Sequence, residues 1–216
     1  MTEIRYNLTF RTPVSIFSGL AIAGLVDRMV MRNKEGLPYI PGSSIKGRWR
    51  FFAERLLHAG GLPDGLWIHE INGTLCKDAA SACTLCKLFG NSAIQAIVSI
   101  SQAELNDSKK PLFLALLNQN QNPVVYPDTE IRPGIAISRV CHTTMDDHLF
   151  FDEVVPSSLT FSGRVLLNGV LSDIENKFLA ASGRLVDRIG GRKAIGRGEL
   201  EDGIQIMGGA SWLPLA

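Results

Sequence analysis

The sequence has no long apolar run, no recognisable targeting signal and no disulfide layout. Its longest uncharged stretch, residues 111–127, is broken by prolines and an Asn/Gln run, so it cannot form a membrane-spanning helix of roughly 20 apolar residues. The N-terminus alternates charged and apolar residues, unlike a signal peptide. Three of the four cysteines are clustered and one stands alone, unlike a disulfide framework. We therefore expect a soluble, cytoplasmic protein with no membrane partner.

A surplus of charge of either sign is also absent. The chain has 22 Lys+Arg and 21 Asp+Glu, a formal net charge of +1, which argues against a protein that holds a polyanion by bulk charge alone. Positive charge is nevertheless concentrated in residues 46–55 and 184–197. With 216 residues, 45% of them hydrophobic and 20% charged, we expect one packed domain with insertions.

Apolar periodicity predicts the first elements. Residues 4–11 alternate in the manner of a strand with one buried face. Ser43 or Ser44 is then expected to cap a helix, because apolar residues recur at helical spacing from there until Gly60.

A second helix is predicted from the capping box of Ser172 and Glu175, with apolar spacing that continues to Ile189. Further extended segments are expected at 25–32, 93–105, 135–140, 158–167 and 201–207. The order of strand, helix, strands, helix and strand is the split βαβ pattern of an α+β core of RRM-like or ferredoxin-like type.

The cysteine cluster predicts a metal site in residues 62–90, a segment without periodicity that indicates an insertion. Cys83 and Cys86 have the Cys-x-x-Cys spacing that lets two thiolates on one turn reach a single ion, and Cys76 can supply a third ligand. Three reduced cysteines without metal are the competing interpretation.

His69 is the nearest histidine to this cluster and would complete a Cys3His set, with His58 as the alternative ligand. Such a set leaves no open coordination position, so a zinc ion there would be structural.

Residues 190–198 combine four glycines with Arg192, Lys193 and Arg197. Glycines let backbone amides approach phosphates while basic side chains neutralise them. The segment lacks the Lys-Ser/Thr pair of a Walker A sequence and follows a helix, so neither that site nor a dinucleotide fingerprint fits. A solvated turn is the alternative meaning of the pattern.

Residues 38–50, Pro-Tyr-Ile-Pro-Gly-Ser-Ser-Ile-Lys-Gly-Arg-Trp-Arg, closely resemble the signature of the RAMP superfamily, the RNA-binding subunits of CRISPR effector complexes. Further matches are Thr12-Pro13 with Ser18-Gly19, Cys-x-x-Cys-Lys-Leu-Phe-Gly at 83–90, Arg132, Arg139 and the 190–198 loop. The closest likeness is to the repeating backbone subunits of type III (Csm/Cmr-like) complexes.

The resemblance implies a single domain, 1–216, with an RRM-like core, a zinc-bearing insertion at 62–90 and a protruding hairpin, or thumb, at 140–155. It implies crRNA, target RNA, other effector subunits and further copies in a helical filament as partners, in antiviral defence. The implied RNA-contacting residues are Ser44, Lys46, Arg48, Arg50, Arg132, Arg139, Gly191, Arg192, Lys193 and Arg197. The implied zinc ligands are His69, Cys76, Cys83 and Cys86.

Catalytic members of the family carry an Asp just before the Pro-Gly-Ser-Ser segment, and Asp27 stands at that place. The resemblance implies that Asp27 holds a divalent ion such as Mg²⁺, or positions the ribose 2′-OH, during cleavage of target RNA to a 2′,3′-cyclic phosphate. The expected activity is that of an endoribonuclease. The alternative is a non-catalytic filament subunit in which Asp27 is a surface residue.

Two features depart from the family pattern. Ser15 stands where members often carry His. The expected thumb holds Asp146, Asp147, Asp152 and Glu153 and no basic residue, so we expect it to repel phosphates and to act by shape, with apolar wedging by Met145, Leu149 and Phe150. The same acids together with His148 suggest a competing metallohydrolase site.

Overall fold

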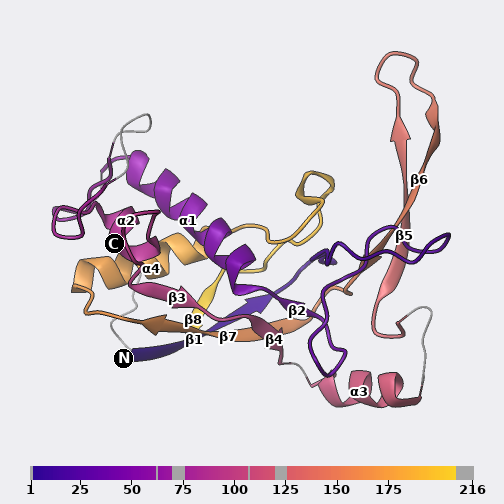
Figure 1. Cartoon of the computed structure of the whole chain (residues 1–216), viewed down its shortest axis with the longest axis horizontal. Helices are drawn as coiled ribbons and strands as arrows, with labels where there is room; N and C mark the ends of the chain where they lie inside the picture. Colours follow the sequence, from indigo (N-terminus) through magenta and orange to yellow (C-terminus); the bar gives the residue numbers. More distant parts are fainter. Residues whose placement is uncertain (1, 62, 70–75, 107, 120–125, 208–216) are drawn as a thin grey trace.

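The computed structural model describes residues 2–61, 63–69, 76–106, 108–119 and 126–207 (Figure 1). Its elements are β1 (Thr2–Thr9), β2 (Tyr39–Ile40), α1 (Gly42–His58), α2 (Thr84–Phe89), β3 (Val98–Ile100), β4 (Ala103–Leu105), α3 (Lys110–Gln119), β5 (Glu130–Ile137), β6 (Thr144–Val154), β7 (Thr160–Leu167), α4 (Asp173–Arg184), a 3₁₀ turn η1 (Lys193–Ile195) and β8 (Gln205–Met207). The protein is therefore of the mixed α+β class. None of the described helices is long and apolar enough to cross a bilayer.

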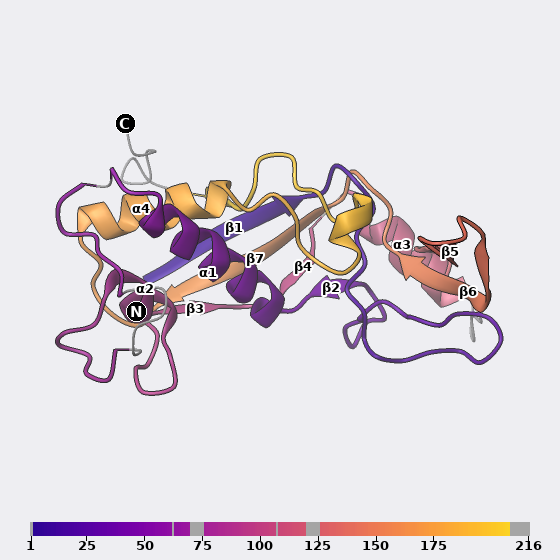
Figure 2. The ribbon, with the colours of Figure 1, turned by 90° about the horizontal axis from the view of Figure 1, so that it is seen from above.

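One antiparallel sheet forms the centre of the molecule, in the order β2-β4-β7-β1-β8, with β3 also paired to β7. Its longest ladder joins β1 to β7, from Thr2 opposite Leu167 to Thr9 opposite Thr160. Helices α1 and α4 lie side by side over one face of this sheet (Figure 2). Among the described residues, no helix covers the other face in this way, and polar side chains such as Arg5, Asn7 and Arg164 lie there.

The core lies between the sheet and the two helices. The alternation of β1 turns Tyr6 and Leu8 inward, where both are fully buried. Trp49 of α1 is also fully buried, and its indole N–H donates to the carbonyl of Leu179 at 3.2 Å and to the hydroxyl of Ser182 at 3.0 Å. These bonds satisfy the polar edge of the ring and hold α1 against α4.

Strands β5 and β6 form a separate hairpin that projects from one end of the sheet, whereas α2 lies at the other end (Figures 1 and 2). At the base of the hairpin, Val155 pairs with Val14 and Asp152 forms a bridge with Arg28. The hairpin is thereby anchored to the two segments that precede α1.

Several predicted elements are confirmed with small shifts. The first strand, the helix after the Pro-Gly-Ser-Ser segment, the strand near 158–167 and the capping box of Ser172 with Glu175 are all present. The segment 93–105 forms two short strands, β3 and β4, and the last strand covers only Gln205–Met207.

Other predictions are wrong. The N-cap of α1 is Pro41, with no side-chain cap bond, because the helix begins one residue before Ser43. Helix α4 ends at Arg184. Beyond it, Val186 and Ile189 are buried although they lie in a loop, whereas Leu185 is exposed. The segment 25–32 makes isolated bridges instead of a strand. Helices α2 and α3 were not predicted. Strand β6 lies within the hairpin expected at 140–155, but its partner β5 begins at Glu130, five residues before the strand expected at 135–140.

Candidate functional site

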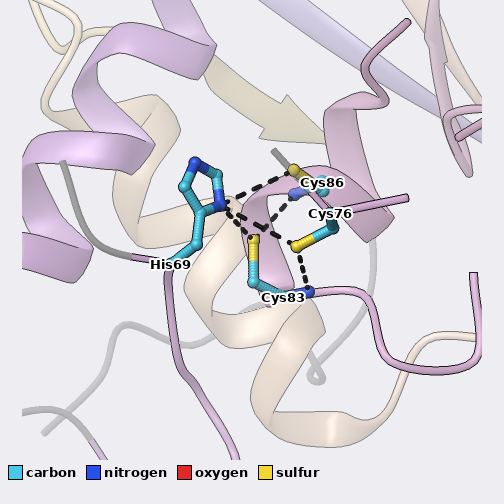
Figure 3. Close-up of side chains that lie close together, drawn as sticks. All are labelled: His69, Cys76, Cys83 and Cys86. Carbon is cyan, nitrogen blue, oxygen red and sulfur yellow. Dashed lines mark hydrogen bonds between the residues drawn. The ribbon is translucent and has the colours of Figure 1, made fainter. Parts of the chain in front are cut away.

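Four potential metal ligands converge beside α2 (Figure 3). Nδ1 of His69 lies 3.2 Å from Sγ of Cys83, 3.8 Å from Sγ of Cys86 and 3.9 Å from Sγ of Cys76. A tetrahedral ion with bonds of about 2.3 Å to sulfur and about 2.0 Å to nitrogen separates such ligands by roughly 3.6 Å. The four residues can therefore hold a metal ion, and His58 is not among them.

The short helix α2 positions two of these ligands. Cys83 is its N-cap, and the backbone N–H of Cys86 donates to the Cys83 sulfur at 3.4 Å. The backbone N–H of Cys83 donates in turn to the Cys76 sulfur and lowers the pKa of that thiol, whereas burial raises the pKa of Cys86 to about 11. Because metal ligation requires thiolates, binding at this site releases protons.

The basic residues of α1 have different environments. Arg48 donates to Asp187 and to the carbonyl of Arg188, both at 2.9 Å. Arg50 donates to the carbonyl of Gly90, the C-cap of α2, at 2.5 Å. Both arginines thus connect parts of the fold.

Lys46, one turn before Arg50, has no ion-pair or side-chain hydrogen-bond partner in the part of the chain that the structure describes. Burial and the nearby Arg50 charge lower its pKa. An anion at this position would relieve that repulsion. Ser44 lies half-buried in the same first turns of α1.

Asp27 lies at the base of the hairpin. Its backbone N–H donates to the carbonyl of Phe151 at 2.9 Å, and the N–H of Phe151 donates to Oδ2 of Asp27 at 2.7 Å. The residue is exposed. Its carboxylate is thus held in a fixed position on the surface between the hairpin and the segment that precedes α1.

Asp152, on β6 at the same base, is fully buried and faces three arginines. Its Oδ2 lies 2.9 Å from Arg197 and 3.2 Å from Arg192, and its Oδ1 lies 3.9 Å from Arg28. Oδ1 has no hydrogen-bond partner. Ion pairs of this kind offset the cost of burying the carboxylate.

A second group of buried ion pairs, centred on Arg32, lies beside Asp152. Arg32 contacts Asp128 at 2.9 Å and Glu153 at 2.6 Å, and its guanidinium lies 3.5 Å from the ring centroid of Tyr126. The backbone N–H of Val30 also donates to Glu153. These contacts attach β6 and the residues just before β5 to the segment that follows Asp27.

The expectation of an acidic, phosphate-repelling hairpin is therefore wrong for its base. Two of the four acids, Asp152 and Glu153, are buried against arginines from other segments, which a count along 140–155 does not include. The metallohydrolase hypothesis also fails, because the group around His69 is the only cluster of three or more potential ligands among the described residues.

The 190–198 loop packs against the residues that follow β1. The N–H of Gly191 donates to the carbonyl of Ser15 at 2.8 Å, and Gly190, with φ of 106°, leaves no room there for a Cβ. Arg197 is buried between Ser15 and Asp152, and Lys193 donates to the carbonyl of Gly190. Ser15, where the family often has His, thus anchors this loop.

The remaining hairpin residues are more exposed. Arg132 pairs with Glu130 at 2.9 Å on β5, and Arg139 lies exposed in the turn between the strands. Ile137 and Leu149 are each 59% exposed. The outer hairpin therefore presents apolar side chains to solvent.

A sequence model of the RAMP superfamily matches residues 7–201, which is most of the chain. The protein belongs to the RAMP superfamily. Membership points to a CRISPR-associated, RNA-binding subunit. A search of curated proteins returns no significant match.

For this RAMP protein, sequence reasoning found the four clustered ligands but missed the residues that organise the hairpin base. Arg28, Arg32, Asp128 and Phe150 come together from three segments. The three segments lie far apart in the sequence, so no spacing pattern links these residues. Asn91, which donates to the Cys86 sulfur at 3.3 Å, was missed because no spacing pattern marks it either.

Proposed function

We propose that the protein is a crRNA-binding backbone subunit of a type III (Csm/Cmr-like) CRISPR complex that cleaves target RNA at Asp27. The observation that carries this proposal is the position of Asp27, fixed by two hydrogen bonds to Phe151 at the foot of a projecting hairpin. In the proposed complex, the hairpin is the thumb that opens the guide–target duplex. A carboxylate at its foot would then lie next to the distorted phosphodiester.

An RRM-like core is part of this proposal. It is supported by the chain order of β1, α1, the β3/β4 segment, β7, α4 and β8, and by their arrangement in space with β1 and β7 at the centre. RRM sheets commonly bind RNA by stacking bases on aromatic side chains. The described residues of β1 and β7 on the open face are Arg5, Asn7, Thr9, Ser162 and Arg164, and none of them is aromatic, so we place the RNA along α1 and the hairpin base.

The RNA path would pass Ser44 and Lys46 and reach the 190–198 loop. Among the proposed basic contacts on α1 and in the loop, Lys46 has no side-chain partner within the described residues, and Arg192 keeps 26% of its side chain exposed beside Asp152. The side chains of Arg48, Arg50, Lys193 and Arg197 instead bind the protein itself. These four side chains would therefore act by shaping the protein surface that faces the RNA. Arg132 and Arg139 remain proposed contacts along the hairpin, and Gly191 remains one in the loop.

Cleavage would proceed by attack of a ribose 2′-OH on the adjacent phosphorus, with the 5′-oxygen as leaving group and a 2′,3′-cyclic phosphate as product. The free oxygen of Asp27 can accept the 2′-OH proton or help to bind a divalent ion such as Mg²⁺. Within the described residues Asp27 belongs to no group of three or more potential metal ligands, so RNA oxygens and water would complete that coordination. Splaying of the duplex supplies the in-line geometry.

The metal at His69, Cys76, Cys83 and Cys86 is proposed to be a structural zinc ion, since four protein ligands leave no open position. Copies of the subunit are proposed to stack along crRNA in the cytoplasm, as part of antiviral defence. The exposed apolar hairpin supports such contacts.

The test is cleavage of a labelled complementary RNA by the assembled complex carrying Asp27→Ala. We expect loss of cutting with assembly unchanged, while Asp146→Ala, on the exposed part of the same hairpin, keeps full activity. Unchanged cutting by an intact Asp27→Ala complex would leave the alternative, a non-catalytic filament subunit.

A further inference from the structure

Three arginines at the hairpin base share one buried carboxylate. Arg28, Arg192 and Arg197 all lie within 4 Å of Asp152. The neighbouring acids Asp128 and Glu153 are paired with Arg32 instead. The side chain of Arg197 is only 9% exposed, so it is not available to a ligand from solvent.

Arg28 and Arg192 instead keep part of their surface in solvent. Their side chains are 45% and 26% exposed, respectively. Oδ1 of Asp152 has no hydrogen-bond partner, and its nearest cation, Arg28, is 3.9 Å away. Arg28 is therefore the loosest member of the cluster, with most of its five N–H donors available.

The ring of Phe150 lies against both of these partly exposed arginines. The Arg192 guanidinium lies 4.2 Å from the ring centroid, and that of Arg28 lies 5.7 Å from it. Arg28 also lies 5.5 Å from the ring of Phe17. Stacking on rings restricts guanidinium rotation without using its N–H groups.

Two backbone features also accompany the packing of Arg192 and Phe150 in this cluster. Arg192 is one of the few non-glycine residues with a positive φ, 57°, a conformation that is strained for a side chain of this kind. Gly134, opposite Phe150 on β5, gives the ring its place, since a Cβ there would overlap the ring. The cluster is thus held by contacts from three separate segments.

We propose that Arg28 and Arg192 form a binding site for one phosphodiester of RNA, beside Asp27, with Asp152 as the residue that positions both. The site rests on the proposed function and extends it, because it adds arginine side chains that can bind the phosphate beside the carboxylate of Asp27. Planar guanidinium groups bind phosphate oxygens in pairs, and here they would also draw charge from the phosphorus under attack.

The test measures binding of a fluorescein-labelled single-stranded RNA to the full chain by anisotropy over a range of NaCl concentrations. For single strands, each phosphate contact contributes about 0.7 to the slope of log K against log salt. We expect Arg28→Gln and Arg192→Gln each to reduce the slope by about that amount and to weaken binding several-fold. Arg28→Lys, which keeps the charge, should restore the slope.

Arg164→Gln is the matched control, since Arg164 is an exposed arginine on the open sheet face, away from this cluster. Its slope should equal that of the unmodified chain. If both Gln variants at the hairpin base bind with unchanged slope and affinity, the phosphate site is wrong while RNA binding stands. If the unmodified chain does not bind RNA, the phosphate site and the proposed function fall together.

Discussion

The amine of Lys87 lies 2.6 Å from Oε1 of Glu175, which joins the helix that carries two metal ligands to the capping box of α4. Glu175 is almost fully buried and also accepts the N–H of Ser172. A single carboxylate thus connects the insertion to the helix layer.

This contact predicts a pH-dependent stability. Burial alone would raise the pKa of Glu175, but the hydrogen bonds from Lys87 and Ser172 outweigh it and lower that pKa below its ordinary value. The carboxylate therefore stabilises the fold above the unfolded pKa, near 4.5, and this contribution is lost as pH falls through the lower folded value. Glu175→Gln should cost about 1 kcal/mol at pH 7, measured by urea unfolding.

The same comparison at pH 3 supplies the control. At pH 3, below the unfolded pKa, the stabilisation by the charged carboxylate declines as the pH falls toward the lower folded pKa, so the difference between the two proteins should shrink. A difference that stays constant from pH 7 to pH 3 would show that the ion pair with Lys87 contributes nothing.

Metal removal should loosen the end of the molecule that contains α2. With its four ligands released, α2 keeps its packing against the helices, including the Phe89–Trp49 ring contact and the Lys87–Glu175 ion pair, but the segments that carry His69 and Cys76 lose their link to it. We expect a chelator, or Cys83→Ser, to lower the melting temperature and to abolish stoichiometric zinc. Elemental analysis and calorimetry measure the two effects, and Asp146→Ala should change neither.

Gly47 predicts effects of opposite sign on stability and on binding. It lies exposed within α1, and a Cβ there would meet no atom within 4 Å, so the fold itself does not require glycine. Gly47→Ala should stabilise the free protein by about 1 kcal/mol. If RNA approaches α1 beside Lys46, the added methyl group should also weaken RNA binding, measured by anisotropy. Tighter or unchanged binding would place the RNA elsewhere.

Asp152→Asn should be strongly destabilising. The change leaves Arg197 buried with no charged partner, and breaking a buried pair typically costs about 3–5 kcal/mol. Asp146→Asn, at an exposed position, should stay within about 0.5 kcal/mol of the unmodified protein. Denaturant unfolding followed by circular dichroism compares them, and equal stabilities would contradict the role given to Asp152.

Local patterns predicted the parts of this fold that local patterns determine. The alternation of β1, the apolar stripe of α1 and the capping box of α4 are encoded within single segments. The metal ligands were found because two of them follow a fixed spacing on one turn. Helix α2 was missed because it is only six residues long and lies among polar loop residues.

The hairpin base could not be predicted in this way. Asp152 is separated from Arg28 and from Arg197 by many residues, and only tertiary folding brings them within 4 Å. Along the sequence these acids indicated a repulsive thumb, whereas the fold pairs them with arginines. The sign of charge at a surface depends on which segments meet there, which a linear count does not contain.

Guide-RNA binding within a CRISPR complex is the property on which the proposed function depends most. The most direct measurement is to purify the protein from its native host and sequence the RNA that accompanies it. We predict small RNAs of uniform length that carry CRISPR repeat sequence at one end and spacer sequence beyond it, lost when Lys46 and Arg192 are both changed to Gln. A purified protein that carries no RNA, or only fragments of abundant cellular RNA, would contradict the account.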